Sequence, residues 1–177
     1  VRPDLVRMME RKERVVTQLR DSIEVLLKKA KVQVLRGNGR LDGPTTVTVE
    51  TADGPMTLEA DRIILATGSE PAYLPMFDFG HPAILTSTSA LELREIPSSM
   101  VIVGAGVIGC EFASLFAELG THITMVEMMP QMLPLEDKRL AKQFQGVYRK
   151  RGIEVLLKTK VEEISDYAAD HVVARLS

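Results

Sequence analysis

The sequence has one cysteine, Cys110, among its 177 residues, and it has no tryptophan. A single thiol cannot form a disulfide within the chain or a CxxC metal site, because both need at least two cysteines. One cysteine is typical of a protein from a reducing compartment, so we expect a cytoplasmic location. This absence excludes a small disulfide-stapled scaffold.

Long apolar runs and a strong net charge are also missing. No apolar stretch approaches the roughly 20 residues that cross a bilayer, and the formal net charge is −2. Residues 1–40 hold 11 Lys+Arg against 5 Asp+Glu, and the rest hold 11 against 19. A basic helix can bind a membrane surface or RNA, but the interleaved acids favour a solvated helix face. We expect neither membrane nor nucleic acid as a partner.

Apolar residues recur every three or four positions between Asp4 and Ala30, which predicts a long amphipathic helix. The segments "TTVTVET" and "MTLEADRIILATG" then alternate around an Asp-Gly turn and predict a β-meander. The apolar run Arg62–Ala66 should end this meander as a strand that is covered on both faces.

A change of rhythm marks a domain boundary at Pro97, where a short helix in "STSALELREIP" should stop. Beyond it the pattern predicts a Rossmann-like βαβαβ unit of the α/β class, with a parallel sheet and right-handed crossovers. The expected strands are Met100–Val103, His122–Val126 and Ile153–Leu157, and the expected helices are 106–119 and 135–151. The last residues, from "KVEEIS" onward, should form a small antiparallel excursion.

Three glycines form a G-x-G-x-x-G motif between the first of these strands and its helix. Gly104 suits a tight turn, Gly106 lets the backbone approach a pyrophosphate, and Gly109 lets the helix pack closely on the strand. The helix N-terminus offers free N–H groups and a positive dipole end to the phosphates. The motif therefore predicts dinucleotide binding.

An acid at the end of the second strand supports this prediction. Glu127 follows the last motif glycine by about 20 residues, where a carboxylate can bind the hydroxyls of an adenosine ribose. The same carboxylate would repel a 2′-phosphate, and no base follows it before Lys138. We therefore expect NAD rather than NADP.

Two neighbours of the motif have alternative interpretations. Cys110 could be activated by the helix N-terminus, but inert packing against the sheet is favoured. Glu111 could either reach the nicotinamide or simply complement the helix dipole, and the residues alone leave both open. The three histidines have no ligand cluster at metal spacing, so no metal and no catalytic histidine are expected.

Four segments together carry a resemblance to a known family: "RIILATGSEP", "TSTSALELREIP", "GAGVIGCEFASLFAELGTHITMVE" and "RGIEVLLKTKVEEI". The chain resembles the pyridine nucleotide-disulfide oxidoreductases, and most closely their dihydrolipoamide dehydrogenase branch. The resemblance covers nearly the whole chain. It implies that residues 1–96 are the second part of an FAD-binding domain and that 97–177 are a C-terminally incomplete NAD-binding domain.

The resemblance also implies roles for particular residues. FAD would be lined by Gly39, Thr67, Gly68 and Ser69. NAD would be bound by the loop from Gly104 to Glu111, by Glu127 at the ribose and by Val161 at the adenine. Within that loop, the resemblance covers Gly104, Ala105, Gly106, Val107, Ile108, Gly109 and Glu111. It places Ile108 and Glu111 near the nicotinamide, which favours the functional interpretation of Glu111.

Several parts of the family pattern are missing from this sequence. There is no FAD-binding G-x-G-x-x-G, no pair of redox cysteines and no His-Glu base, so we expect an internal fragment that is inactive alone and contains no catalytic residue. The parent would be a homodimer within a 2-oxo acid dehydrogenase complex. The alternatives are mercuric reductase, transhydrogenase, NADH oxidase or peroxidase, and a free-standing NAD-binding module.

Overall fold

The computed structural model describes residues 3–177, which divide into two compact units. One unit contains Pro71–Ser177 together with the described residues up to Glu10, and the other contains Arg11–Glu70. No helix in residues 3–177 is long and apolar enough to span a bilayer. In the sequence analysis, an FAD-binding part is separated from an NAD-binding part between residues 96 and 97. That boundary is defined by which cofactor is bound, and it stays a prediction.

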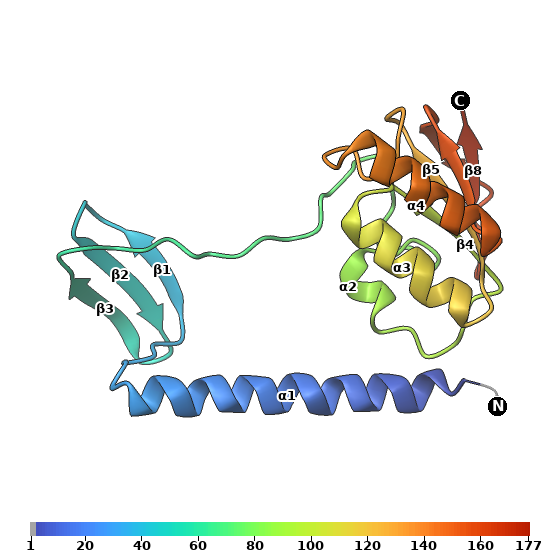
Figure 1. Ribbon diagram of the computed structural model, residues 1–177. Helices are drawn as coiled ribbons and strands as arrows, with labels where there is room; N and C mark the ends of the chain where they lie inside the picture. Colours follow the sequence, from blue (N-terminus) through green and yellow to red (C-terminus); the bar gives the residue numbers. More distant parts are fainter. Residues whose placement is uncertain (1–2) are drawn as a thin grey trace. The chain divides into compact units, whose positions relative to one another are not determined.

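Helix α1 (Leu5–Lys29) confirms the long helix that the periodicity predicts (Figure 1). Its first two turns bury Leu5 and Met9. Several apolar side chains further along the helix are exposed: Val15, Leu19, Ile23 and Leu26. Most of the apolar face of this amphipathic helix is therefore solvent-accessible, and only its start contributes to a core.

The β-meander is also confirmed. Three antiparallel strands pair in the order β1-β2-β3, with the bounds Asn38–Leu41, Thr46–Thr51 and Gly54–Glu59 (Figure 1). Thr51 pairs with Gly54 across a two-residue turn. The φ angle of Gly54 is +112°, which glycine adopts without the steric cost of a Cβ.

The strand predicted for Arg62–Ala66 is wrong. These residues form no strand, and the side chains of Ile64 and Leu65 are 89% and 68% exposed. A strand exists only where its N–H and C=O groups find a neighbouring strand. Both edges of β2 are already taken by β1 and β3, and no strand in residues 3–177 pairs with this segment. The apolar run is thus extended but unpartnered.

The short helix α2 (Ser87–Ala90) forms at the predicted place but ends well before Pro97. Thr86 caps it in a capping box with Ser89. The next N–H groups, of Leu91 and Glu92, bond to the carbonyl three residues back rather than four. This tighter 3₁₀-type pattern ends helices, so residues 91–96 form turns and bends instead of a further helical stretch.

The βαβαβ unit is confirmed. Strands β4 (Ser99–Val103), β5 (His122–Glu127) and β6 (Glu154–Leu157) pair in parallel in the order β4-β5-β6. Helices α3 (Val107–Glu118) and α4 (Lys138–Lys150) connect them. Both helices lie on one face of the sheet (Figure 1), as right-handed crossovers in one direction require. The α/β fold class holds.

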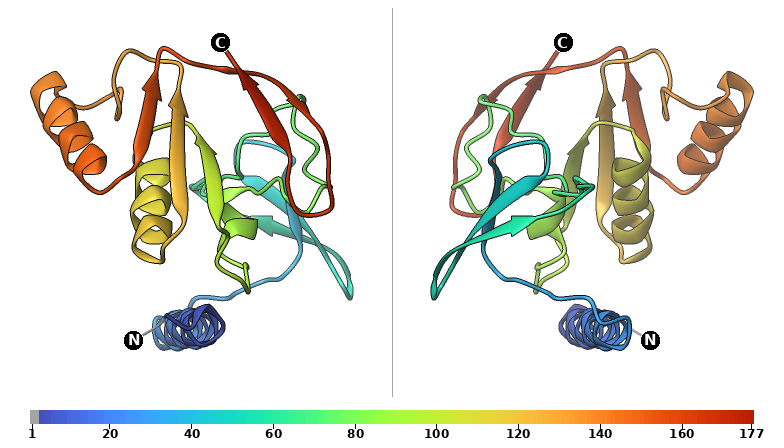
Figure 2. Two further views of the ribbon diagram at one scale, coloured as in Figure 1. Left: turned by 90° about the vertical axis from the view of Figure 1, so that its right-hand side faces the viewer. Right: turned by 90° about the vertical axis from the view of Figure 1, so that its left-hand side faces the viewer.

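The opposite face of the sheet is covered by other segments. The predicted antiparallel excursion is β7 (Val161–Ser165) paired with β8 (Val173–Leu176), on the side away from α3 and α4 (Figure 2). Val126 packs there with Phe77 and Val161, while Met125 packs on the helical side. Since β5 is buried on both faces, its carboxyl end is held rigidly.

Candidate cofactor-binding site

The chain itself explains why Gly104 and Gly109 are glycines: Gly104 has a left-handed backbone angle, and Gly109 has no room for a Cβ. Gly104 follows β4 with a φ of +101°, and its N–H donates to the carbonyl of Val126 at 2.8 Å. A Cβ at Gly109 would lie 2.1 Å from the carbonyl oxygen of Gly104. The first turn of α3 therefore lies directly against the glycine turn.

Gly106 differs from the other two motif glycines. Its φ and ψ of −75° and −176° are extended values open to any residue, and a Cβ there would meet no atom within 4 Å. Gly106 is the N-cap of α3, and no side chain caps this helix within the described chain. Free N–H groups and the positive end of the helix dipole at an open position suit an anion such as a pyrophosphate.

Glu127 is the last residue of the central strand β5. It lies at the carboxyl end of the parallel strands, where β4 also leads into the glycine turn. Its side chain is buried, at 6% exposure. One carboxylate oxygen, Oε2, accepts the N–H of Ala105 at 2.8 Å, and Oε1 accepts the N–H of Met129 at 2.8 Å. Each oxygen keeps capacity for a second donor, so the carboxylate can still accept hydrogen bonds from hydroxyl groups.

The loop after β5 contributes residues that the sequence argument missed. Leu133 donates its N–H to the carbonyl of Ala105 at 2.8 Å and has a φ of +48°, which is uncommon outside glycine. Met132 is buried in the same cluster as Ala105. The only sequence signal was a set of apolar residues within a proline-containing stretch.

Val107, Ile108 and Glu111 lie on the first turns of α3 and are exposed. The structure thus brings them beside the glycine turn with their side chains accessible to a ligand. The side chain of Glu111 makes no ion pair with another described residue. Its proposed place near a nicotinamide stays a prediction.

The segment after β6 returns to Glu127. Thr159 donates its N–H to the carbonyl of Glu127 at 3.0 Å, and Lys158 donates its N–H to the carbonyl of Met129 at 3.1 Å. Val161 follows at the start of β7 and is buried. Lys158 is exposed and lies at the same carboxyl end of the sheet. Only the residues between Glu127 and Lys138 were considered in the sequence analysis, so this base was not found there.

The residues assigned to FAD by resemblance belong to the other unit. Gly39 pairs with Val49 within β1 and β2, and Thr67, Gly68 and Ser69 follow β3 in an extended segment. All four are exposed, and Gly68 has a φ of +82°. No hydrogen bond joins Gly39 to the other three in the described chain, so their shared role stays a prediction.

Cys110 is a packing residue, as the sequence argument favoured. Its side chain is 4% exposed, and its Sγ lies 3.6 Å from the carbonyl oxygen of Ala105. Burial raises the pKa of this thiol, and the nearby carboxylate of Glu127 adds to the rise. The phenol of Tyr148 donates to the carbonyl of Cys110 at 2.7 Å and ties α4 to α3. A raised pKa disfavours the reactive thiolate.

We expect Cys110 to react with a thiol-specific disulfide reagent at pH 8 at least about tenfold more slowly in the folded chain than in denaturant, because burial limits both access and ionisation. The measurement is the rate of chromophore release, and one cysteine per chain makes the signal unambiguous. Equal rates in the folded and unfolded chain would show that Cys110 is accessible and reactive.

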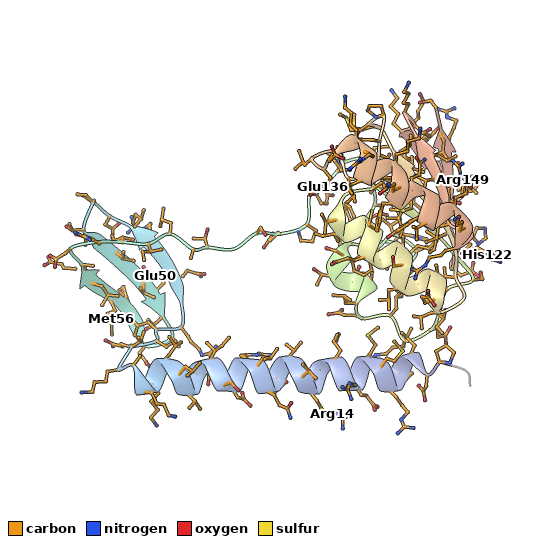
Figure 3. All side chains as sticks on the ribbon, viewed as in Figure 1. Arg14, Glu50, Met56, His122, Glu136 and Arg149 are labelled. Atoms are coloured by element: carbon orange, nitrogen blue, oxygen red, sulfur yellow. The ribbon has the colours of Figure 1, made fainter. Side chains whose placement is uncertain are left out.

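The histidines lie away from the glycine turn or in loops. His122, labelled in Figure 3, is exposed at the amino end of β5, whereas the glycine turn lies at the carboxyl edge of the sheet. His171 contacts Asp170 at 2.8 Å on an exposed loop. No group of three or more His, Cys, Asp or Glu side chains in residues 3–177 is placed to hold a metal ion.

The chain matches a protein-family model described as pyridine nucleotide-disulphide oxidoreductase over residues 2–175. It is 40% identical over 165 residues to a dihydrolipoyl dehydrogenase of Bacillus subtilis, covering 93% of this chain and 36% of that protein. It is 41% identical over 162 residues to a leghemoglobin reductase of Vigna unguiculata, covering 91% and 31%. The chain thus spans about a third of the length of these relatives.

Solved structures agree with this pattern. LpdA from Mycobacterium tuberculosis superposes with a TM-score of 0.89 at 27% identity, covering 100% of this chain and 40% of that one. The HOCl-induced flavoprotein disulfide reductase RclA from Escherichia coli gives a TM-score of 0.85 at 30% identity, covering 98% and 39%. The similarity extends over essentially the whole length of the present chain.

Proposed function

Because the chain belongs to the pyridine nucleotide-disulphide oxidoreductase family, we propose that it carries the NAD-binding part, and a section of the FAD-binding part, of a dihydrolipoamide dehydrogenase. Relatives named dihydrolipoyl dehydrogenase are 40% identical to it over 165 and 161 aligned residues. In such an enzyme dihydrolipoamide is oxidised through a redox disulfide and FAD, and the nicotinamide accepts the hydride.

The observation that supports NAD binding most directly is the contrast among the three motif glycines. Gly104 needs its positive φ, and Gly109 lies against backbone. Gly106 is required by neither conformation nor packing, since its Cβ position is open. A glycine that the fold does not need, at the uncapped N-terminus of a helix, is explained by a ligand that approaches the backbone there.

Each residue of the site has a role in this proposal. The N–H groups at the start of α3 bind the pyrophosphate, and Glu127 accepts the ribose hydroxyls while it stays buried. Val161 borders the adenine from the start of β7. Ile108 and Glu111 lie on the exposed turns of α3 toward the nicotinamide. The chain therefore binds and orients the dinucleotide.

We expect the 177-residue chain to bind NAD at least about tenfold more tightly than NADP, because the buried Glu127 carboxylate opposes a 2′-phosphate. Isothermal titration with each dinucleotide measures this ratio. Preference for NADP, which the nearby Lys158 could favour by charge, would contradict the assignment of NAD.

FAD and lipoamide turnover belong to the whole protein in this proposal. The chain has a single cysteine and therefore cannot form a redox disulfide within itself. We propose that Gly39 and residues 67–69 contribute part of a flavin site whose remaining residues this chain does not supply. An assay of NADH formation from dihydrolipoamide should show no turnover by the purified chain.

The proposed context follows from the same relatives. The whole protein would be a homodimeric component of a 2-oxo acid dehydrogenase complex in the cytoplasm. Relatives named dihydrolipoyl dehydrogenase, from Bacillus subtilis and Chlamydia trachomatis, are each 40% identical to the chain over about nine-tenths of its length, which supports this branch.

A further inference from the structure

Ala105, the residue between the first two motif glycines, is held from two sides. Its N–H donates to Oε2 of Glu127 at 2.8 Å, and its carbonyl accepts the N–H of Leu133 at 2.8 Å. Ala105 itself is fully buried. Both partners come from the end of β5 and the loop that follows it, so the shape of the glycine turn depends on residues more than 20 positions away.

The side chain of Glu127 is suited to this contact by its chemistry. It faces two backbone donors at once, the N–H groups of Ala105 and Met129, with one carboxylate oxygen for each. A carboxylate offers acceptors on both atoms, whereas an amide of the same shape would present its NH₂ group to one of the two donors. A buried N–H that loses its acceptor is costly.

We propose that Glu127 is a positioning residue, which holds the glycine turn in the shape that accepts a pyrophosphate before any dinucleotide is bound. This rests on the proposed NAD-binding function and adds a second role to the ribose contact. The carboxylate bonds to Ala105 and Met129, which both belong to this chain, so these contacts need no dinucleotide to form. A turn that is ordered in advance costs less conformational entropy when the ligand binds.

Amide hydrogen exchange of the ligand-free chain tests the positioning role without any dinucleotide. In Glu127→Gln the amide of Ala105 should exchange at least about tenfold faster relative to the amide of Met125 in the core of β5. Faster exchange at Met129 alone would overturn the proposal, because Met129 lies outside the glycine turn. Unchanged relative rates, or an equal acceleration of all three amides, would overturn the proposal, because neither shows a local release of the turn.

A dinucleotide without the 2′ and 3′ hydroxyls of its adenosine ribose separates the two roles of Glu127. If Glu127 also positions the turn, Glu127→Gln binds this analogue at least about threefold more weakly than the unmodified chain does. Equal affinity would mean that Glu127 acts through the ribose alone and would overturn the positioning role.

Glu118→Gln is the matched control, since Glu118 is an exposed glutamate on α3 whose ion pair with Arg151 lies on the surface. This variant should exchange and bind like the unmodified chain. If the unmodified chain binds neither NAD nor the analogue, the proposed function fails, whereas the exchange rates at Ala105 and Met129 still decide whether Glu127 holds the turn.

Discussion

Replacing Gly106 by valine should reduce NAD affinity at least about 100-fold, which is roughly 2.7 kcal/mol, while leaving the fold intact. The loss is expected because the branched side chain would occupy the open position where the pyrophosphate reaches the N–H groups of α3. The fold is expected to survive because a Cβ at Gly106 meets no atom within 4 Å and its backbone angles suit any residue. Valine as an N-cap should cost no more than about 1 kcal/mol.

Isothermal titration of NAD and urea unfolding, measured on the same preparation, separate binding from stability. Gly146→Val is the matched control, since Gly146 lies in α4 and also has open space at its Cβ position. The control should bind NAD with unchanged affinity. An unchanged NAD affinity in Gly106→Val would rule out pyrophosphate binding at this turn.

Gly109→Ala should lower the free energy of unfolding by about 2–3 kcal/mol, the upper part of the range for overpacked sites. The added methyl carbon would lie 2.1 Å from the carbonyl oxygen of Gly104 and 3.3 Å from the Cγ2 of Ile102. The first of these is backbone that cannot rotate away, so α3 must move off the glycine turn. NAD binding should weaken with it, because both ends of the motif shift.

Urea unfolding followed by circular dichroism measures this loss. Gly146→Ala is the natural comparison, since it makes the same change at another helical glycine. There the alanine should stabilise the chain by about 0.5–1 kcal/mol, because glycine is a poor helix former. If Gly109→Ala proves as stable as the unmodified chain, the close contact between Gly104 and Gly109 is absent in solution.

The alternating unit was predictable because its signals are local. The strands and helices of the βαβαβ unit begin and end within three residues of the predicted bounds, since periodicity and the motif glycines act over a few neighbouring residues. The strand at Arg62–Ala66 was not predictable in the same way. Its apolar residues are right for a strand, but a strand also needs a hydrogen-bonding neighbour, which these residues do not have in the described chain.

In the candidate site, too, some residues could be predicted from the sequence and others could not. Gly104 and Glu127 could be singled out from spacing alone, because the strand-turn-helix context places them at one edge of the sheet. Leu133 and Lys158 could not, since their relation to the turn arises from loops that return to it. No base follows Glu127 in the sequence before Lys138, yet the fold brings Lys158 to the loop after β5, where its N–H bonds to the carbonyl of Met129.

The parallel α/β unit, the glycine turn and the acid at the end of β5 could all be located from the amino-acid sequence, because each depends on residue types at short, regular spacing. The folded structure was needed to show that Gly106, alone among the motif glycines, is required neither by its backbone angles nor by packing, and that Glu127 is bonded to Ala105 and Met129. These features depend on contacts between segments that are far apart in the sequence. Such contacts form only when folding brings the segments together.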